Sequence, residues 1–108
     1  MRERNIQDDI RKAIPPSLAV LWRNNVGMRE DMGPDFAIRR TRFGLFKGSS
    51  DLIGIRKRDG RFIALEVKKP GEEPTPEQED FMRIVRGGGG IVAVVTSVQE
   101  ALRAIREG

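Results

Sequence analysis

Apolar residues repeat at helical spacing in three segments of the chain. Residues 3–14 carry an isoleucine at every fourth position from 6 to 14, and two prolines follow them. Residues 76–86 start with a proline after Thr75, a favourable N-cap, and stop at four glycines. Ser97 can cap a third segment, whose apolar stripe consists of Val98, Ala101, Leu102 and Ile105. The pattern predicts three amphipathic helices.

Shorter runs rich in apolar and β-branched residues predict strands between these helices. Residues 18–26 and 91–96 form two such runs, and two more lie between residues 50 and 69. Residues 27–36 have the composition of a loop, and residues 37–46 that of an irregular strand or an ordered loop. The predicted order is α-β-β-β-α-β-α, an α/β fold in which helices flank a mixed central sheet.

Composition limits the chemistry that the chain can perform. Its 108 residues and 12.2 kDa suit one domain spanning residues 1–108. Without cysteine or histidine it has no disulfide, no His or Cys zinc centre and no histidine general base. No apolar run is long enough to span a membrane or to form a signal peptide, so we expect a cytoplasmic protein without membrane contact. A net charge of +4 weakly favours an anionic partner.

The two strands between residues 50 and 69 carry charges where a core would be apolar. Asp59-Gly60 between them predicts a hairpin with a two-residue type I′ turn and Arg58 opposite Arg61. That register puts Asp51 opposite Lys68 and Ile53 opposite Glu66, all on one face. Asp51 and Glu66 are then diagonal neighbours, roughly 7 Å apart. The other face is apolar as well, which favours a central position between helices.

Buried charges are costly unless they are paired or bind a metal. Two carboxylates without histidine or cysteine suit a hard cation, Mg²⁺ or Mn²⁺. Such an ion polarises phosphate oxygens and lowers the pKa of water, and Lys68 can stabilise developing negative charge. The alternative is an Asp51–Lys68 salt bridge with Glu66 at a sheet edge.

Two further polar residues have both a structural and a functional interpretation. Glu3 extends the buried stripe of the first helix, where it is either a partner of the helix dipole or a third carboxylate near the metal. Gln78 stands three residues after Thr75, the spacing of a capping box, which explains it without catalysis. Both roles of Gln78 require that its side chain can turn.

Basic residues gather just before the charged strands. Residues 39–47 contain three arginines and a lysine without any acidic residue, interleaved with Phe43 and Phe46. This composition is typical of a nucleic-acid surface, and equally of a solvated strand with two core phenylalanines. Trp22, between apolar neighbours in the first predicted strand, is expected in the core.

Four short motifs occur in order along the chain. They are Glu3-x-x-Ile6-Gln7, Gly48-x-x-Asp51, Glu66-x-Lys68 and Thr75-x-x-Gln78. Together they resemble a VRR-NUC domain, the virus-type replication-repair branch of the PD-(D/E)xK nuclease superfamily. Ser50 stands where the broader superfamily has proline, but the Gly-x-x-Asp form fits this branch.

The resemblance implies a restriction-endonuclease-like core and phosphodiester hydrolysis with a divalent metal. Asp51, Glu66 and the main-chain carbonyl of Val67 would be metal ligands, and Lys68 would orient water or phosphate. Glu3 would be an additional ligand, directly or through a water, and Gln78 would support the site. The residues expected to contact DNA are Arg4, Arg39, Arg40, Arg42, Lys47, Ser49, Ser50 and Lys69.

The resemblance also implies a substrate and an assembly. Stand-alone members of this length are viral or bacterial homodimers associated with cleavage of Holliday junctions, which places the protein in a bacterial or phage-infected cytoplasm. We therefore expect a structure-selective DNA endonuclease that uses Mg²⁺ or Mn²⁺ at branched DNA. The alternatives are a non-catalytic nucleic-acid-binding module that uses residues 39–47, and a nuclease for flaps, ends or other nucleic acids.

Overall fold

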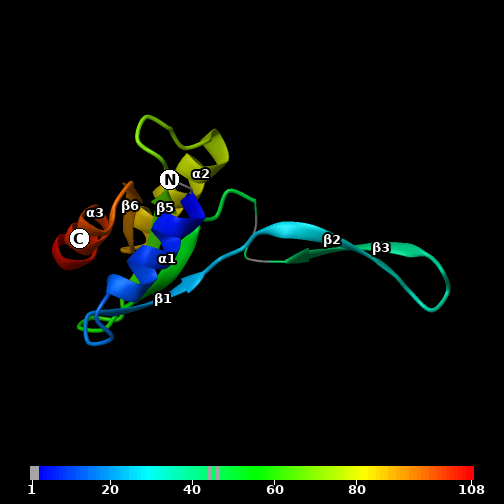
Figure 1. Cartoon of the computed structure of the whole chain (residues 1–108), viewed down its shortest axis with the longest axis horizontal. Helices are drawn as coiled ribbons and strands as arrows, with labels where there is room; N and C mark the ends of the chain where they lie inside the picture. The colour runs from blue at the N-terminus through cyan, green and yellow to red at the C-terminus, as the bar shows by residue number, and fades with distance from the viewer. Residues whose placement is uncertain (1–2, 44, 46) are drawn as a thin grey trace.

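A computed structural model describes residues 3–43, 45 and 47–108 of the chain and contains a four-stranded mixed sheet with helices on both faces (Figure 1). The strand order is β1-β4-β5-β6, and only β5 and β6 run parallel. The elements are α1 (Glu3–Ala13), β1 (Ala19–Arg23), β2 (Gly27–Met32), β3 (Ile38–Phe43), β4 (Leu52–Arg56), β5 (Phe62–Val67), α2 (Pro76–Gly87), β6 (Ile91–Val95) and α3 (Val98–Glu107).

The body of the molecule confirms the predicted order α-β-β-β-α-β-α, from α1, β1, β4, β5, α2, β6 and α3. The loop prediction for residues 27–36 was wrong, because β2 lies there. It pairs with β3 in an antiparallel hairpin that projects from the body, and we call residues 27–43 the arm (Figure 1). Among the side chains of the arm that the structure describes, Met32, Phe36 and Ile38 are exposed rather than packed in a core. The arm therefore need not have the alternation of apolar and polar residues that identifies a half-buried strand.

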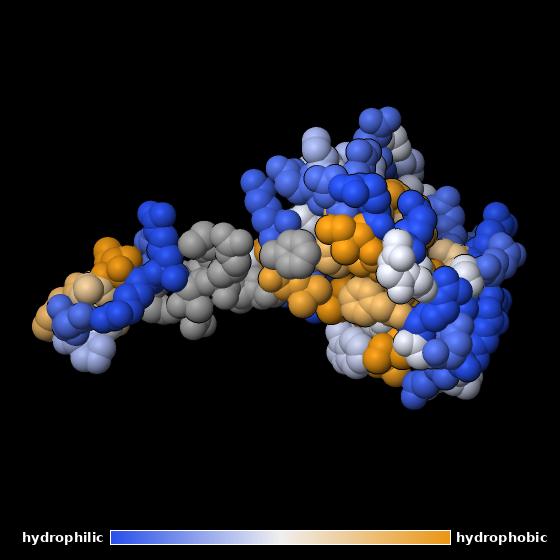
Figure 2. All heavy atoms as spheres, turned by 180° about the vertical axis from the view of Figure 1, so that it is seen from behind, coloured by the Kyte–Doolittle hydropathy of each residue, from blue (hydrophilic) through white to orange (hydrophobic). Residues whose placement is uncertain are grey.

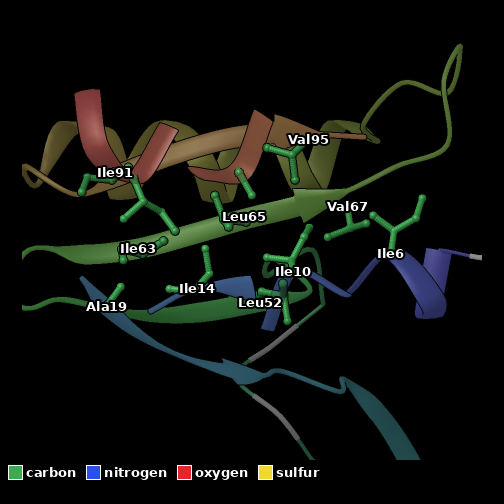
Figure 3. Close-up of a cluster of buried hydrophobic side chains, with 12 residues drawn as sticks. Ile6, Ile10, Ile14, Ala19, Leu52, Ile63, Leu65, Val67, Ile91 and Val95 are labelled. Atoms are coloured by element: carbon green, nitrogen blue, oxygen red, sulfur yellow. The ribbon is translucent and has the colours of Figure 1, made fainter. Parts of the chain in front are cut away.

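The main core lies between the sheet and two helices. Ile6 and Ile10 of α1, and Ile14 directly after it, are buried and face the sheet on the same side as α3 (Figure 3). Strand β5 is buried on both sides from Ile63 to Val67, which confirms its central position. Helix α2 contributes nothing to this cluster and contacts β5 and β6 instead. It therefore packs on the opposite face of the sheet.

The hairpin of β4 and β5 has a different register from the predicted one. Arg56 donates its backbone N–H to the carbonyl of Arg61, so four residues, 57–60, form the loop. Arg56 is buried, and its guanidinium forms an ion pair with the Asp59 carboxylate at 2.6 Å. The guanidinium also donates to the backbone carbonyls of Ile105 and Gly108. Asp59 therefore lies in a four-residue loop and pairs with Arg56, and it does not form the predicted two-residue turn. Leu52 lies opposite Leu65, which brings Asp51 directly opposite Glu66.

The second face of the sheet is only partly covered by α2. Trp22, expected in the core, is 48% exposed there, because β1 is an edge strand beyond the reach of α2. Its cross-strand neighbour is Ile53, and Ile55 and Phe62 are also exposed on this face. Figure 2 shows apolar side chains on this side of the body and at the end of the arm. None of the helices within the described part of the chain is long and apolar enough to cross a membrane.

Candidate functional site

Asp51 and Glu66 form the centre of the site. Glu66 lies on β5 with 1% of its surface exposed, and its Oε1 accepts a hydrogen bond from Nε2 of Gln78 at 3.0 Å. Asp51 directly precedes β4, and its Oδ2 accepts a hydrogen bond from the backbone N–H of Val67 at 2.9 Å. Oε2 of Glu66 is buried and has no hydrogen-bond partner among the described residues. A buried carboxylate oxygen without a partner leaves room for a cation or a proton.

The electrostatics of Asp51 and Glu66 favour binding of a cation or a proton. Burial, together with the neighbouring carboxylate of Asp51, raises the pKa of Glu66 to about 9, and the positive charge of Lys68 offsets only part of this rise. Without a cation, Glu66 therefore carries a proton at neutral pH. A bound cation would replace that proton, and the all-oxygen donor set fits a hard divalent ion.

Glu3 lies beside a carboxylate that sequence reasoning missed. Burial and a hydrogen bond with the Glu72 side chain raise the pKa of Glu3, and Lys68 and Asp51 are close enough to influence it. Glu72 accepts the backbone N–H of Lys69 at 2.9 Å, which with the Glu3 contact lowers its own pKa. Pro70-Gly71 was the available signal, since proline followed by a glycine at φ +90° forms a turn that returns Glu72 to Lys69.

The acidic residues do not form a preassembled cage. Among the residues that the structure describes, no group of three or more carboxylates lies close enough together to hold a metal ion. The pair of Asp51 and Glu66 would need other oxygen donors, such as the Val67 carbonyl, water, or Glu3 through a water. Lys68 is half-buried at the end of β5 and acts electrostatically on both Glu3 and Glu66.

Gln78 makes the contacts of a capping box and a contact with Glu66 at the same time. Its Oε1 accepts the backbone N–H of Thr75 at 2.8 Å, and its own backbone N–H donates to Oγ1 of Thr75, which completes a capping box. Its Nε2 remains free to donate to Glu66. The expectation that the side chain must turn between these roles was wrong, because an amide has a donor end and an acceptor end.

Gly48 brings the start of α2 close to the loop that carries Asp51. It has φ +92°, and a Cβ atom there would lie 2.7 Å from the backbone oxygen and the Cβ of Glu77, which adjoins Gln78. Only glycine tolerates both conditions. The close approach keeps Gln78 within reach of Glu66.

We predict that Gly48→Ala weakens the site by separating α2 from this loop. The free energy of unfolding should fall by about 2–4 kcal/mol, from left-handed strain plus overpacking. Gly89→Ala is the matched control, because Gly89 has φ +93° and no atom near the added Cβ. It should lose about 1–2 kcal/mol from strain alone. Urea denaturation measures both losses, and equal losses would contradict the proposed contact.

Ser49 and Ser50 do not occupy the expected surface. Ser49 is 8% exposed and Ser50 is fully buried, because the loop around them folds under the end of β1. Their hydroxyl groups are thus not offered to DNA, and we assign both residues to the interior of the site.

The basic residues expected to contact DNA are distributed more widely. Arg39 and Arg40 are exposed on the arm, where they form ion pairs with Asp35 at 2.9 Å and Glu30 at 3.2 Å. The backbone of Arg42 lies in β3, but its side chain, the side chain of Phe43 and the whole of Phe46 lie outside what the structure describes. The remaining expected contacts that are exposed are Arg4, Lys47 and Lys69. Charge alone therefore does not mark the arm as the DNA surface.

Comparison with known proteins adds an independent observation. A family model described as VRR-NUC domain matches residues 1–99 of the chain, a span that includes every residue of the site. No curated protein matches the chain.

Proposed function

The chain belongs to the VRR-NUC domain family, and from this premise we propose that it is a metal-dependent endonuclease that cleaves branched DNA. Membership makes it a nuclease-type domain that acts on DNA, in a superfamily that typically uses divalent metals. We propose that the metal is Mg²⁺ or Mn²⁺ and that the bond it helps to cleave is an internal phosphodiester bond of DNA.

One observation carries the proposal: a fully buried glutamate with an unpartnered oxygen lies opposite a second carboxylate. Asp51, Glu66 and the main-chain carbonyl of Val67 would hold the ion, with Glu3 behind a water. When bound, the ion supplies Lewis-acid chemistry, polarising a phosphate oxygen and making water more acidic. Gln78 fixes the Glu66 carboxylate through the oxygen that would not face the ion.

Lys68 complements this acidic centre. Its ammonium group is close enough to Glu66 to lower the pKa of that carboxyl, against the effect of burial. Lys68 therefore interacts electrostatically with the carboxylates of the site. It is the charge that would meet a scissile phosphate and stabilise the negative charge that develops there. The exposed residues Arg4, Lys47 and Lys69 would attract the adjoining DNA backbone.

The arm supports branched DNA as the substrate. It makes the molecule 52 Å long against 31 and 28 Å in the other directions, so body and arm offer separated points of contact. A four-way (Holliday) junction presents two equivalent strands, which a symmetric homodimer would meet together. Sedimentation at assay concentration tests the dimer, and a mass of one 12.2 kDa chain would count against it.

A substrate panel tests the function. Junction, flap, linear duplex and single-stranded DNA are incubated with Mg²⁺, Mn²⁺ or EDTA, and products are separated on denaturing gels. We expect internal cuts in the junction with either metal and none with EDTA. Preferred cleavage of flaps or ends would replace the substrate proposal. Salt-sensitive binding without cleavage in any metal would instead support a non-catalytic binding module.

We predict that Lys68→Met lowers single-turnover cleavage about a hundredfold, because it removes the positive charge near Glu66 that would stabilise the phosphate. Methionine keeps most of the aliphatic stem, so the fold should persist. Lys69→Met is the matched control, since the neighbouring lysine is exposed, and it should reduce cleavage only slightly at low salt. Equal effects of the two substitutions would assign Lys68 to general DNA attraction.

A further inference from the structure

Asn24 connects three parts of the molecule that are distant in sequence. It follows β1 and is 9% exposed. Its Nδ2 donates to Oγ of Ser49 at 2.7 Å and to the carbonyl of Ser50 at 2.9 Å, and its Oδ1 accepts the backbone N–H of Leu45 at 3.2 Å. Its backbone N–H donates to the carbonyl of Asp51 at 2.8 Å.

These contacts use both donors and the acceptor of the amide in a buried place. Shortening the side chain would remove all three of these bonds, and the buried Ser50 carbonyl would lose its bond to the amide. Three of the four partners belong to the short segment that ends in Asp51. The segment lies just before β4, which begins at Leu52, and these bonds hold it against the end of β1.

Asn24 also lies at the base of the arm. It stands between β1 and β2, where the chain enters the arm, and Leu45 stands two residues after β3, where the chain returns. The bond from Leu45 to Asn24 closes this base. The Asn24 amide thus contacts both the base of the arm and the segment that carries Asp51.

We propose that Asn24 is a positioning residue that holds the Asp51 carboxylate on the Val67 amide and opposite Glu66, and that it joins the arm to the site. The consequence for metal binding and cleavage rests on the proposed function, but the placement of Asp51 does not. Asn24 touches neither metal nor DNA in this proposal and acts through Asp51.

The test combines a metal-free measurement with two measurements on the loaded protein. Hydrogen exchange is followed by NMR at the Val67 amide, which donates to Asp51, and at the Leu65 amide within the sheet. Mn²⁺ affinity is measured by calorimetry, and kcat and KM are measured on the junction. The variants are Asn24→Ala, which removes the whole amide, and Ser49→Ala, which removes one partner. Asn25→Ala, at the exposed neighbouring asparagine, is the matched control.

In Asn24→Ala we expect at least tenfold faster exchange at Val67 with exchange at Leu65 unchanged. Loss of support for a metal ligand typically costs 10–100-fold, so Mn²⁺ affinity and kcat should fall by about that factor with KM nearly constant. Ser49→Ala should show smaller changes in the same three quantities. If Asn24→Ala does not fold, Ser49→Ala provides the test instead. The control should match wild type.

Wild-type exchange at Val67 and wild-type Mn²⁺ affinity in folded Asn24→Ala would overturn the inference. A uniform rise in exchange at both amides would also overturn it, because the residue would then support the fold in general. If the wild-type protein neither binds Mn²⁺ nor cleaves DNA, the proposed function fails, while the exchange data still decide whether Asn24 holds Asp51.

Discussion

Glu66→Gln is expected to abolish metal-dependent cleavage while the metal-free protein remains folded. Glutamine has the same shape, and its carbonyl oxygen can still accept the hydrogen bond from Nε2 of Gln78. Its amide group would donate to the Asp51 carboxylate from the position where Oε2 now has no partner. The substitution therefore removes a negative metal ligand without leaving a cavity. We expect a loss of cleavage rate of about a thousandfold, equivalent to roughly 4 kcal/mol.

Two measurements separate this outcome from unfolding. Mn²⁺ titration should show weakened binding, and thermal unfolding with EDTA at pH 8 should give a midpoint at or above that of wild type. Glu73→Gln is the control, because Glu73 is exposed on the loop before α2 and should leave cleavage and Mn²⁺ binding unchanged. Retained cleavage in Glu66→Gln would remove Glu66 from the metal site.

The body of the fold follows from local patterns because its elements face a core. The isoleucine spacing of α1, the N-caps of α2 and α3, and the apolar strands each predict an element that the structure contains. In the arm, β3 agrees with the irregular strand that was one of the two options for residues 37–46, but β2 and its pairing with β3 were missed. The two strands of the arm form a separate sheet, and its described apolar side chains at Met32, Phe36 and Ile38 are exposed, so no buried face gives these strands a periodic pattern.

The sequence predicted which residues lie at the centre of the candidate site, but it predicted their geometry less well. Asp51, Glu66 and Lys68 share a face in either register, because the error was two residues and side chains alternate with period two. The register itself depended on Arg56, whose buried guanidinium recruits Asp59 from the turn. That partnership joins the hairpin to the C-terminal helix, and a local turn rule carries no information about it.

The contacts of Asn24 and Glu72 were beyond sequence reasoning for another reason. Asn24 bonds to residues more than twenty positions away, so its role depends on where β1 meets the Asp51 segment. Glu72 meets Glu3 across nearly seventy positions, although its turn was readable. Long-range contacts between polar groups follow from the tertiary fold. The sequence motifs do not predict these contacts, but they predict the central residues of the site, Asp51, Glu66 and Lys68.

The pH dependence of stability gives the second large expected effect. In the absence of metal, the free energy of unfolding should fall as pH rises from 5 to 8. The pKa of Glu66 is about 9 in the folded protein against 4.5 for the free side chain, so within this range the folded state keeps a proton that the unfolded state has lost. Its contribution is complete below pH 4.5 and disappears toward pH 9. The slope is at most about 1.4 kcal/mol per pH unit.

The carboxylates whose pKa values are lowered should leave this pH window nearly undisturbed. The ion pair with Arg56 lowers the pKa of Asp59 to about 2, so its stabilising effect is present above pH 3.8 and disappears only as pH falls toward 2. The lowered pKa values of Glu72 and Glu100 likewise place their titration on the acidic side of the window. Glu3, with a raised pKa, contributes in the same direction as Glu66.

Urea unfolding at pH 5, 6, 7 and 8 with EDTA measures the slope, and Mn²⁺ should oppose it. An ion that binds the ionised pair in the folded state stabilises by RT ln(1 + [Mn²⁺]/Kd), and the gain grows with pH because the ion displaces the proton. Glu66→Gln should flatten the slope and remove the response to Mn²⁺ together. A slope that survives in Glu66→Gln would assign the titration to Glu3 or another group. A Mn²⁺ response that survives would place the ion elsewhere.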